Sequence, residues 1–157
     1  MTTRTNQIPE GVHSVTPHLT VKGASEAIEF YKKAFGALEL MRLPWPDGKL
    51  IMHARIKIGD SPIFITDEFP DMNCAGSDLS GRSPVTIHLY VDDVDKTFKA
   101  ALSAGAKETM PVANMFWGDR YGRLVDPFGH QWSLATHIED LSPDEIAKRA
   151  RTACQQG

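Results

Sequence analysis

The sequence predicts an α+β protein in which one β-α-β-β-β module occurs twice. The first observation is the similarity of residues 18–21 (HLTV) to residues 88–91 (HLYV), at a shift of 88 − 18 = 70 positions. The second is a strand, glycine turn and strand over residues 54–66, which the same shift places on residues 124–136, with Gly59 on Gly129. Two matches at one shift indicate a duplicated supersecondary unit.

The hairpin of the second copy contains the motif Asp-Pro-Phe-Gly at residues 126–129. The Asp126 carboxylate can accept a nearby backbone N–H, and Pro127 restricts its own φ to about −65°, which suits an early turn position. Gly129 can adopt a positive φ without steric cost. The motif therefore predicts a tight turn between two strands.

The composition is that of an ordinary globular protein, with 157 residues, 41% hydrophobic and 24% charged, and one domain is expected. The net charge of −3, with no Lys/Arg run longer than two, excludes the basic surface of a nucleic-acid-binding protein. Residues 1–14 do not resemble a signal peptide, and no stretch reaches the ~18 apolar residues of a membrane span. We therefore expect a cytoplasmic protein without membrane contact. Cys74 and Cys154 lack disulfide or metal spacing and are expected to be reduced.

The first module covers about residues 13–68 and begins with an alternating segment, residues 13–21, which predicts a half-buried strand. Ser25 is placed to cap a helix with apolar residues at helical spacing, and Gly36 is placed to end it. Strands are predicted over residues 38–43, 49–58 and 62–67, and Asp47-Gly48 predicts the first hairpin turn.

Residues 69–84 are rich in Gly, Ser, Asp and Pro without periodicity, which predicts a linker. The second module, about residues 85–138, repeats the order with a strand over 85–91 and a helix from residue 94 that ends at Gly105. Its remaining strands are predicted over residues 109–117, 119–125 and 130–137. Ser142 followed by Pro143 predicts the start of a C-terminal helix over residues 142–154.

Two such modules, with Asp-Pro-Phe-Gly before the last strand, resemble the vicinal-oxygen-chelate superfamily of glyoxalase I, bleomycin and fosfomycin resistance proteins and extradiol dioxygenases. Residues 116–122 (FWGDRYG), followed by residues 126–130 (DPFGH), look most like its PhnB-like, glyoxalase-like branch. The resemblance implies a single domain over residues 1–157. It also implies an eight-stranded cup with outer helices, a ligand inside the cup, and frequent homodimers.

Strand alternation divides the side chains of both modules into two sets. We expect the apolar set to pack under the helices: Leu19, Val21, Phe64, Leu89, Val91, Trp132 and Leu134. We expect the other set to line the cup: Thr16, His18, Thr20, Ile63, Ile65, Thr86, His88, Tyr90, Gln131, Ser133 and His137. Such a mixture of polar and apolar residues suits a small organic ligand.

Arginine and aromatic residues of the second module are further candidates for ligand contact. Arg120 and Arg123 could each clamp a carboxylate or phosphate, but their odd separation puts them on opposite faces of a strand. Arg123 shares the face of Tyr121, with His53 as its expected counterpart, although a solvated strand surface explains this pair equally well. Trp117 could stack on a ligand or pack within its hairpin. The expected ligand-binding residues are His18, Thr20, His53, Thr86, His88, Tyr90, Trp117, Tyr121, Arg123, Gln131 and Ser133.

The resemblance also implies four metal-ligand positions, which here are Thr16, Ile63, Thr86 and Ser133. Hydroxyl groups bind divalent metals weakly beside imidazole or carboxylate, and isoleucine cannot bind them, so we expect no cofactor. The alternative is a site for Zn²⁺, Ni²⁺, Fe²⁺ or Mn²⁺ that uses His18, His88 and Glu68.

Three hypotheses about function follow. The first is a metal-free small-molecule-binding protein that acts by sequestration or by an uncharacterised conversion. The second is a metal-dependent lyase, isomerase or dioxygenase, with His18 and His88 as ligands and Glu68 as general base. The third is a structural or regulatory dimer with a vestigial cup. The sequence names no catalytic residue, substrate or reaction.

Overall fold

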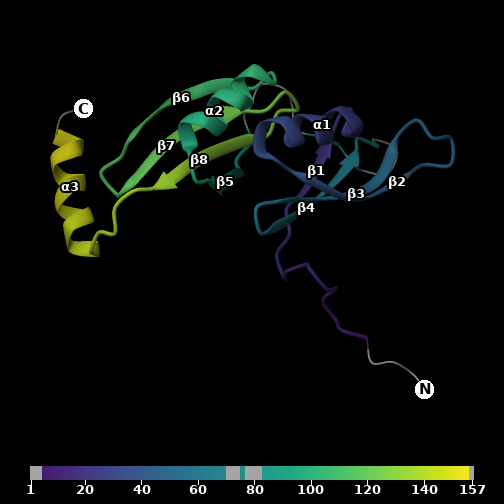
Figure 1. Ribbon diagram of the computed structural model, residues 1–157, viewed down its shortest axis with the longest axis horizontal. Helices are drawn as coiled ribbons and strands as arrows, with labels where there is room; N and C mark the ends of the chain where they lie inside the picture. Colours follow the sequence, from purple (N-terminus) through teal and green to yellow (C-terminus); the bar gives the residue numbers. More distant parts are fainter. Residues whose placement is uncertain (1–4, 70–74, 77–82, 156–157) are drawn as a thin grey trace. The chain divides into compact units, whose positions relative to one another are not determined.

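A computed structural model describes residues 5–69, 75–76 and 83–155 of the chain (Figure 1). The chain divides into two compact units, Met1–Ser77 and Asp78–Gly157. Most of the predicted linker over residues 69–84, including Cys74, lies outside the described residues. The described helices include none that is long and apolar enough to cross a membrane.

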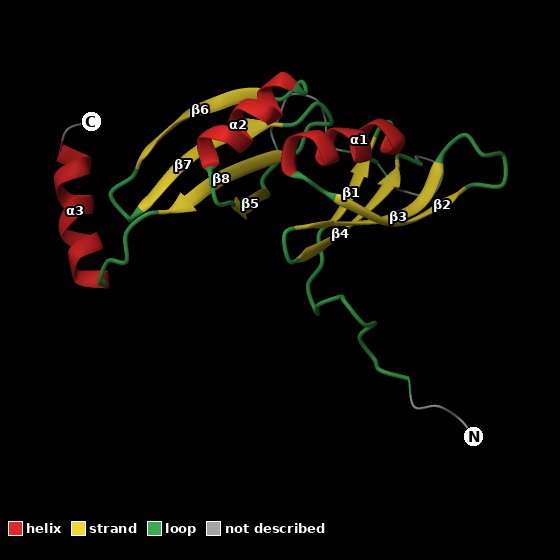
Figure 2. Cartoon of the chain, viewed as in Figure 1, coloured by secondary structure: helices red, strands yellow, loops and turns green. Residues whose placement is uncertain are grey.

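The first unit has one helix and a four-stranded sheet (Figure 2). Its elements are β1 (His18–Val21), α1 (Ala24–Phe35), β2 (Leu38–Pro44), β3 (Ile51–Ile58) and β4 (Ser61–Asp67). The strand order is β1-β4-β3-β2, and β1 runs parallel to β4 while the other neighbours are antiparallel. This confirms the predicted order of elements for the first module.

Helix α1 buries its apolar stripe on one face of the first sheet. Ile28 and Tyr31 of the helix are fully buried, as are Ile56 and Ile65 of the sheet. Gly36 ends the helix at φ 68°, and its N–H donates to the Lys32 carbonyl oxygen at 3.1 Å. A residue with a side chain is strained at this φ, so glycine is the fitting helix stop, as predicted.

The start of α1 differs from the prediction, because the cap is Asp67 and not Ser25. The Oδ1 of Asp67 accepts the backbone N–H groups of Gly23 (3.0 Å) and Ala24 (2.9 Å), and its Oδ2 accepts that of Ile51 (2.7 Å). The hydroxyl of Ser25 instead accepts a hydrogen bond from Arg42. One buried carboxylate at the end of β4 thus holds the starts of both α1 and β3.

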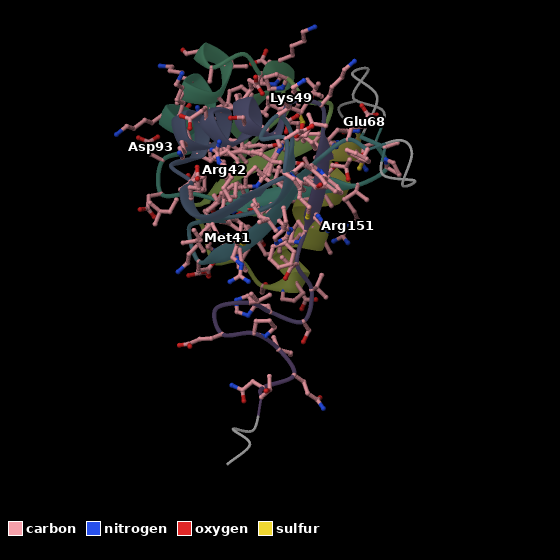
Figure 3. All side chains as sticks on the ribbon, turned by 90° about the vertical axis from the view of Figure 1, so that its right-hand side faces the viewer. Met41, Arg42, Lys49, Glu68, Asp93 and Arg151 are labelled. Carbon is pink, nitrogen blue, oxygen red and sulfur yellow. The ribbon has the colours of Figure 1, made fainter. Side chains whose placement is uncertain are left out.

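Strand β2 forms one edge of the first sheet, and all of its residues are exposed. Arg42 lies on the side of α1, whereas Met41 pairs with Arg55 and lies on the other side (Figure 3). Large apolar side chains are exposed along this edge: Leu38, Leu40, Met41 and Leu43. An edge strand of this composition is a surface on which another chain can pair.

The second unit repeats the arrangement and adds a C-terminal helix. Its elements are β5 (Thr86–Tyr90), α2 (Val94–Ser103), β6 (Lys107–Asn114), β7 (Asp119–Val125), β8 (Gln131–His137) and α3 (Pro143–Gln155). The strand order is β5-β8-β7-β6, with β5 parallel to β8. Phe98 of α2 is buried, as are Leu124, Trp132 and Leu134 of the sheet, which confirms the core position predicted for Trp132.

The predicted turn at residues 126–129 is confirmed, and its Asp126 carboxylate makes one further hydrogen bond that was not predicted. The Oδ1 of Asp126 accepts the backbone N–H groups of Phe128 and His130, both at 2.9 Å, and Gly129 has φ 89°. The Oδ2 of Asp126 accepts the indole N–H of Trp132 at 2.9 Å. The turn carboxylate is therefore also the hydrogen-bond partner of the largest buried side chain.

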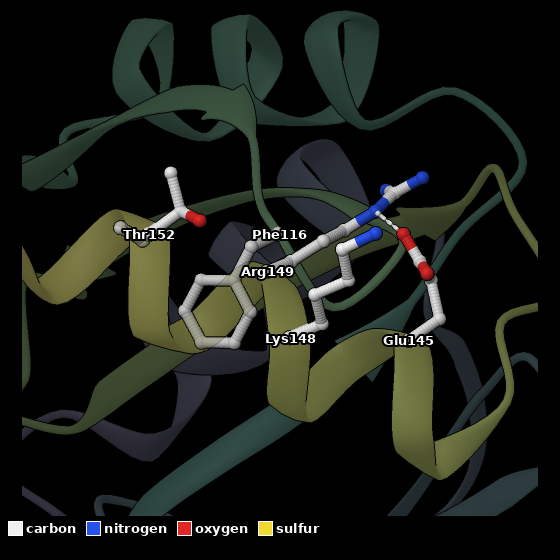
Figure 4. A pocket seen from close by; sticks show the side chains of 6 residues that line it. Phe116, Glu145, Lys148, Arg149 and Thr152 are labelled. Carbon is white, nitrogen blue, oxygen red and sulfur yellow. Dashed lines mark hydrogen bonds and ion pairs between the residues drawn. The ribbon is translucent and has the colours of Figure 1, made fainter.

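Helix α3 confirms the predicted C-terminal helix and its cap. The Ser142 hydroxyl accepts the backbone N–H of Glu145 at 3.1 Å. None of the helix side chains is fully buried, and Arg149 forms ion pairs with Glu139 (3.1 Å) and Glu145 (3.2 Å). Arg149, other residues of α3 and Phe116 together line an open pocket of about 310 Å³ (Figure 4).

The predicted register of β4 is wrong by one residue. Ile63 and Ile65 are buried in the core, whereas Phe64 pairs with His18 and lies on the opposite face. The cause is the length of the loop in the equivalent hairpin of each module. In the first module two residues separate the paired Ile58 and Ser61, whereas in the second module three residues separate the hydrogen-bonded Asp126 and His130. Aligning the two turn glycines therefore shifts β4 by one position, and a one-residue shift exchanges the faces of a strand.

Strand β1 also begins later than predicted, at His18. The hydroxyl of Thr16 donates to the carbonyl oxygen of His13 at 3.2 Å, within the segment expected to be extended. Such local side-chain to backbone hydrogen bonds compete with strand pairing. Strand β6 begins and ends earlier than predicted: it spans Lys107–Asn114, whereas residues 109–117 were expected.

Candidate functional site

The face of the second sheet that lies opposite α2, called here the open face of the second sheet, gathers most of the predicted ligand-binding residues. Strand alternation places on it Thr86, His88 and Tyr90 of β5, Asp119, Tyr121 and Arg123 of β7, and Gln131, Ser133 and His137 of β8. These side chains form hydrogen bonds and ring contacts with one another. Strand alternation thus correctly placed the expected residues of β5 and β8 on one face: Thr86, His88, Tyr90, Gln131, Ser133 and His137.

His88 lies near the middle of this face. Its Nδ1 and the Oγ of Ser133 share a hydrogen bond of 2.7 Å. Its ring meets that of Tyr90 edge-on at 4.5 Å and stacks on that of Tyr121 at 5.9 Å. Burial lowers the pKa of His88, and the negative charge of Asp119 only partly opposes this effect. His88 is therefore a neutral imidazole among aromatic rings at neutral pH.

Asp119 is the residue of this face that the sequence did not single out. Its carboxylate is buried and accepts hydrogen bonds from the Tyr90 hydroxyl (2.9 Å), the Trp117 indole (3.1 Å) and His137 Nδ1 (2.8 Å). Burial alone would raise the pKa of Asp119, but these three donors outweigh it and lower the pKa. Its alternation with Tyr121 and Arg123 along β7 is the sequence signal that could have revealed it.

His137 connects this carboxylate to the segment that leads into α3. Its Nε2 lies 2.7 Å from Asp140, so each ring nitrogen faces a carboxylate. Asp119 and then Asp140 raise the pKa of His137 by these hydrogen bonds. An open cavity of about 440 Å³ lies beside it, lined by Tyr90, Val91, Asp92, Thr136 and His137.

The two arginines proposed as clamps lie on opposite faces of β7, as expected. Arg123 is on the open face and donates to the Oγ of Thr86 (3.0 Å) and to the Oε1 of Gln131 (3.2 Å). Arg120 is on the α2 side, where it forms an ion pair with Asp95 at 2.7 Å. Its pKa is raised by that hydrogen bond. Arg120 is therefore engaged in holding α2, and only Arg123 faces the ligand-binding candidates.

The corresponding face of the first sheet, opposite α1, is called here the open face of the first sheet. His18 and His53 meet edge-on at 5.8 Å, and each also contacts the ring of Phe64, at 5.9 and 4.9 Å. The guanidinium of Arg55 lies over the Phe64 ring, 5.5 Å from its centre. Thr20 follows on β1, two residues from His18 on the same face.

Strand pairing corrects the expected correspondence between the modules. In the first sheet, Arg55 pairs with Phe64, which in turn pairs with His18. In the second sheet, Arg123 pairs with Ser133, which in turn pairs with His88. The counterpart of Arg123 is therefore Arg55 and not His53. His53 corresponds to Tyr121, because each lies two residues before the arginine. The error has the same origin as the shift in β4, since the two hairpin loops differ in length.

The residues at the implied metal-ligand positions do not fit a metal site. The hydroxyl of Ser133 is buried and shares its hydrogen bond with His88, while Ile63 is in the core. Phe64, the counterpart of Ser133 by strand pairing, offers no ligand atom. In the described part of the chain, no three His, Cys, Asp or Glu side chains are grouped so that they could hold a metal.

The alternative metal ligands are distributed over the two units. His18 lies in the first unit among Phe64 and His53, and His88 lies in the second unit beside Ser133. Glu68 follows β4, and its Oε1 accepts the backbone N–H of Gly76 at 3.3 Å. Within its own unit, neither histidine is joined by two further metal-binding side chains among the described residues.

Comparison with known proteins agrees with this architecture. The model of the Glyoxalase/Bleomycin resistance protein/Dioxygenase superfamily matches residues 11–134. The uncharacterized protein Rv0887c of Mycobacterium tuberculosis is 47% identical over 137 residues, which cover 85% of this chain and 79% of that protein. The uncharacterized protein At5g48480 of Arabidopsis thaliana is 31% identical over 119 residues, covering 70% of this chain and 69% of that protein.

Solved structures show the same fold. The At5g48480 structure superposes with a TM-score of 0.63 at 26% identity, covering 78% of this chain and 98% of that one. A PhnB protein from Bacillus cereus, described as a putative 3-demethylubiquinone-9 3-methyltransferase, superposes with a TM-score of 0.63 at 17% identity, covering 79% and 99%. This second likeness concerns the fold alone. With its duplicated module and its family match over residues 11–134, the chain belongs to the glyoxalase/bleomycin resistance protein/dioxygenase superfamily, as its sequence motifs predict.

Proposed function

We propose that the protein is a small-molecule-binding member of its superfamily that works without a metal ion, and that its ligand binds to the open faces of the sheets. The observation that carries this proposal is the hydrogen bond of 2.7 Å between His88 Nδ1 and Ser133 Oγ. It occupies the hydroxyl that stands at an implied metal-ligand position. A serine hydroxyl engaged in this way is a poor ligand for a divalent ion.

The chemistry of the open face of the second sheet supports an organic ligand. Tyr90, Tyr121 and Trp117 supply aromatic surface, while His88 and Arg123 supply polar groups at defined positions. Apolar walls with a few fixed polar groups are typical of small-molecule sites. The side chains are held by mutual hydrogen bonds, so binding needs little reordering of the protein.

Metal analysis of the purified, untagged protein tests the metal-free part of the proposal. We expect no stoichiometric metal before or after dialysis against Zn²⁺, Ni²⁺, Fe²⁺ and Mn²⁺. One tightly held ion per chain that is lost in His18→Ala or His88→Ala contradicts the proposal and favours a metal-dependent lyase, isomerase or dioxygenase.

A thermal-shift screen against a diverse set of small molecules tests the binding part. A ligand that binds only the folded state raises the apparent melting temperature by mass action. Stabilising compounds should lose their effect in Tyr121→Ala, which removes an aromatic ring from the open face of the second sheet. Arg151→Gln is the control, because Arg151 is an exposed residue of α3. A screen without any stabilising compound favours a structural or regulatory protein.

We also propose that the protein forms a homodimer through the edge strand β2. Its exposed Leu38, Leu40, Met41 and Leu43 form an apolar edge that pairs only with β3 in this sheet. Light scattering should give a dimer mass for the wild type. Leu38→Glu with Leu43→Glu should give a monomer, and Lys57→Glu, on the neighbouring strand β3, should not. A monomer mass for the wild type contradicts the dimer.

A further inference from the structure

The guanidinium of Arg55 donates no hydrogen bond to any described residue of its own sheet. It lies in the middle of β3 on the open face of the first sheet, with its guanidinium over the ring of Phe64. Its Nε is buried and has no hydrogen-bond acceptor among the described residues. No carboxylate of the described residues forms an ion pair with it either. A buried guanidinium N–H without an acceptor opposes folding.

The equivalent arginine of the second sheet shows what Arg55 lacks. Arg123 donates to Thr86 of β5 and to Gln131 of β8, two neutral acceptors of its own sheet. Strand pairing gives Thr16 and Pro62 as the counterparts of those acceptors in the first sheet. Proline has no acceptor in its side chain, and the Thr16 hydroxyl is turned to the carbonyl oxygen of His13. The first sheet therefore keeps the arginine but not its acceptors.

Among the described residues, Arg55 has basic neighbours and no carboxylate paired with it. Its neighbours on the open face of the first sheet are His18, Met41, His53, Lys57 and Phe64. Burial lowers the pKa of His53, and electrostatic interaction with His18 and Arg55 lowers it further. Two acidic residues of the first sheet are used elsewhere: Asp67 caps α1, and Glu39 pairs with Lys32 and Arg42. This face thus has the potential that attracts an anion.

We propose that Arg55 binds an oxyanion, a carboxylate or a phosphate or phosphonate group, of the small-molecule ligand, with Phe64 holding the guanidinium plane and His18 and His53 beside it. This inference rests on the proposed function, since it names the chemical class of ligand for one of the open faces. Guanidinium is suited to this task because its planar fork of N–H donors matches two oxygens of a carboxylate or phosphate. The aromatic rings of His18, His53 and Phe64 then contact the apolar part of such a ligand.

The test is an NMR titration of the full-length, ¹⁵N-labelled protein, in which the Arg55 Nε–Hε signal is followed directly. The probes are inorganic phosphate, phenylphosphonate and benzoate, with benzyl alcohol as the neutral counterpart of benzoate. We expect at least one of the anions to move the Arg55 signal saturably and to raise the pKa of His53, and benzyl alcohol to do neither. Comparison of phenylphosphonate with benzoate tells whether the site prefers a tetrahedral or a planar oxyanion.

Variants separate a specific site from a general charge effect. Arg55→Gln should weaken anion binding at least 10-fold, and Arg55→Lys, which keeps the charge but loses the planar fork, should weaken it less. Lys33→Gln removes a charge from an exposed position of α1, on the other side of the sheet, and its affinity should stay within two-fold of the wild type. The amide spectrum of each variant shows whether the first unit keeps its fold.

Three results overturn the anion site: no saturable shift at Arg55 with any anion, unchanged affinity in Arg55→Gln, or an equal loss in Lys33→Gln. The proposed function can be judged separately. If neutral compounds stabilise the protein and no anion binds at Arg55, small-molecule binding stands and the anion site is wrong. If neither anions nor the diverse compound set bind, both proposals are wrong.

Discussion

Arg55 and Arg123 occupy the same position in the two sheets, but only Arg123 has hydrogen-bond acceptors in its own sheet. The Nε of Arg55 is buried without an acceptor among the described residues. Burial of an unpaired donor opposes folding, whereas a paired donor supports it. The equivalent arginines of the two modules therefore have different roles. Arg123 stabilises its sheet, and on our proposal Arg55 binds a ligand.

This difference predicts opposite effects of the same substitution at the two positions. Arg123→Met removes two hydrogen bonds, those to Thr86 and Gln131, and should lower the free energy of unfolding by about 1–2 kcal/mol. Arg55→Met removes an unpaired donor while it keeps an apolar side chain over Phe64, so it should change stability by less than about 0.5 kcal/mol or increase it. Urea unfolding of both variants checks this. A larger loss in Arg55→Met than in Arg123→Met contradicts the assignment.

Asp67 should be one of the most sensitive residues of the first unit. Its carboxylate accepts three backbone N–H groups, those of Gly23, Ala24 and Ile51. Asp67→Ala leaves these donors without an acceptor and should cost about 2–4 kcal/mol of stability. Hydrogen exchange of the three amides should accelerate more than that of amides in the second unit. Asp60→Asn is the control, since Asp60 is exposed and should change stability by less than about 0.5 kcal/mol.

Asp126 should contribute to stability through both its turn and its buried indole partner. Asp126→Asn can still accept the N–H groups of Phe128 and His130 but then turns an amide N–H₂ toward the indole N–H of Trp132. We expect a loss of about 1–2 kcal/mol for Asp126→Asn and a larger loss for Asp126→Ala. The Trp132 indole N–H signal in NMR should shift toward its solvent-exposed position in both. Asp92→Asn, an exposed residue, should leave stability and this signal unchanged.

The pH dependence of stability should reveal the ion pairs of His137. Asp119 and Asp140 raise its pKa in the folded state above the ordinary value of about 6.5. Such a group stabilises the fold fully below about pH 6.5, and the contribution is lost as the pH rises through the raised pKa. The stability difference between wild type and His137→Gln should therefore shrink from about pH 6 to about pH 9. Urea unfolding at both values measures it, and a difference that grows with pH contradicts this account.

Features that depend on neighbouring residues were predictable from the sequence. The turn at Asp126 and Gly129, the helix stop at Gly36 and the cap at Ser142 all formed as expected. Each depends on no more than five consecutive residues, so local spacing contains the whole cause. The order of elements in both modules followed for the same reason.

Features that depend on pairing across the sheet were not predictable in the same way. The register of β4 was missed because a hairpin loop one residue shorter exchanges the faces of Phe64 and Ile63. The helix cap from Asp67 was missed because it lies 43 residues from Ala24. Asp119 was missed because two of its three hydrogen-bond partners, Tyr90 and His137, lie 29 and 18 residues away in the sequence.

The sequence by itself determined that this chain has two β-α-β-β-β modules, which residues alternate along each strand, and which superfamily it resembles. Periodicity and turn chemistry are local properties, so no coordinates are needed to recognise them. Only the tertiary structure decided that Arg55 is the counterpart of Arg123 and that its Nε meets no acceptor of its own sheet among the described residues. Whether a donor is paired depends on the residues that strand pairing brings beside it, and that pairing is set by the length of the intervening loop.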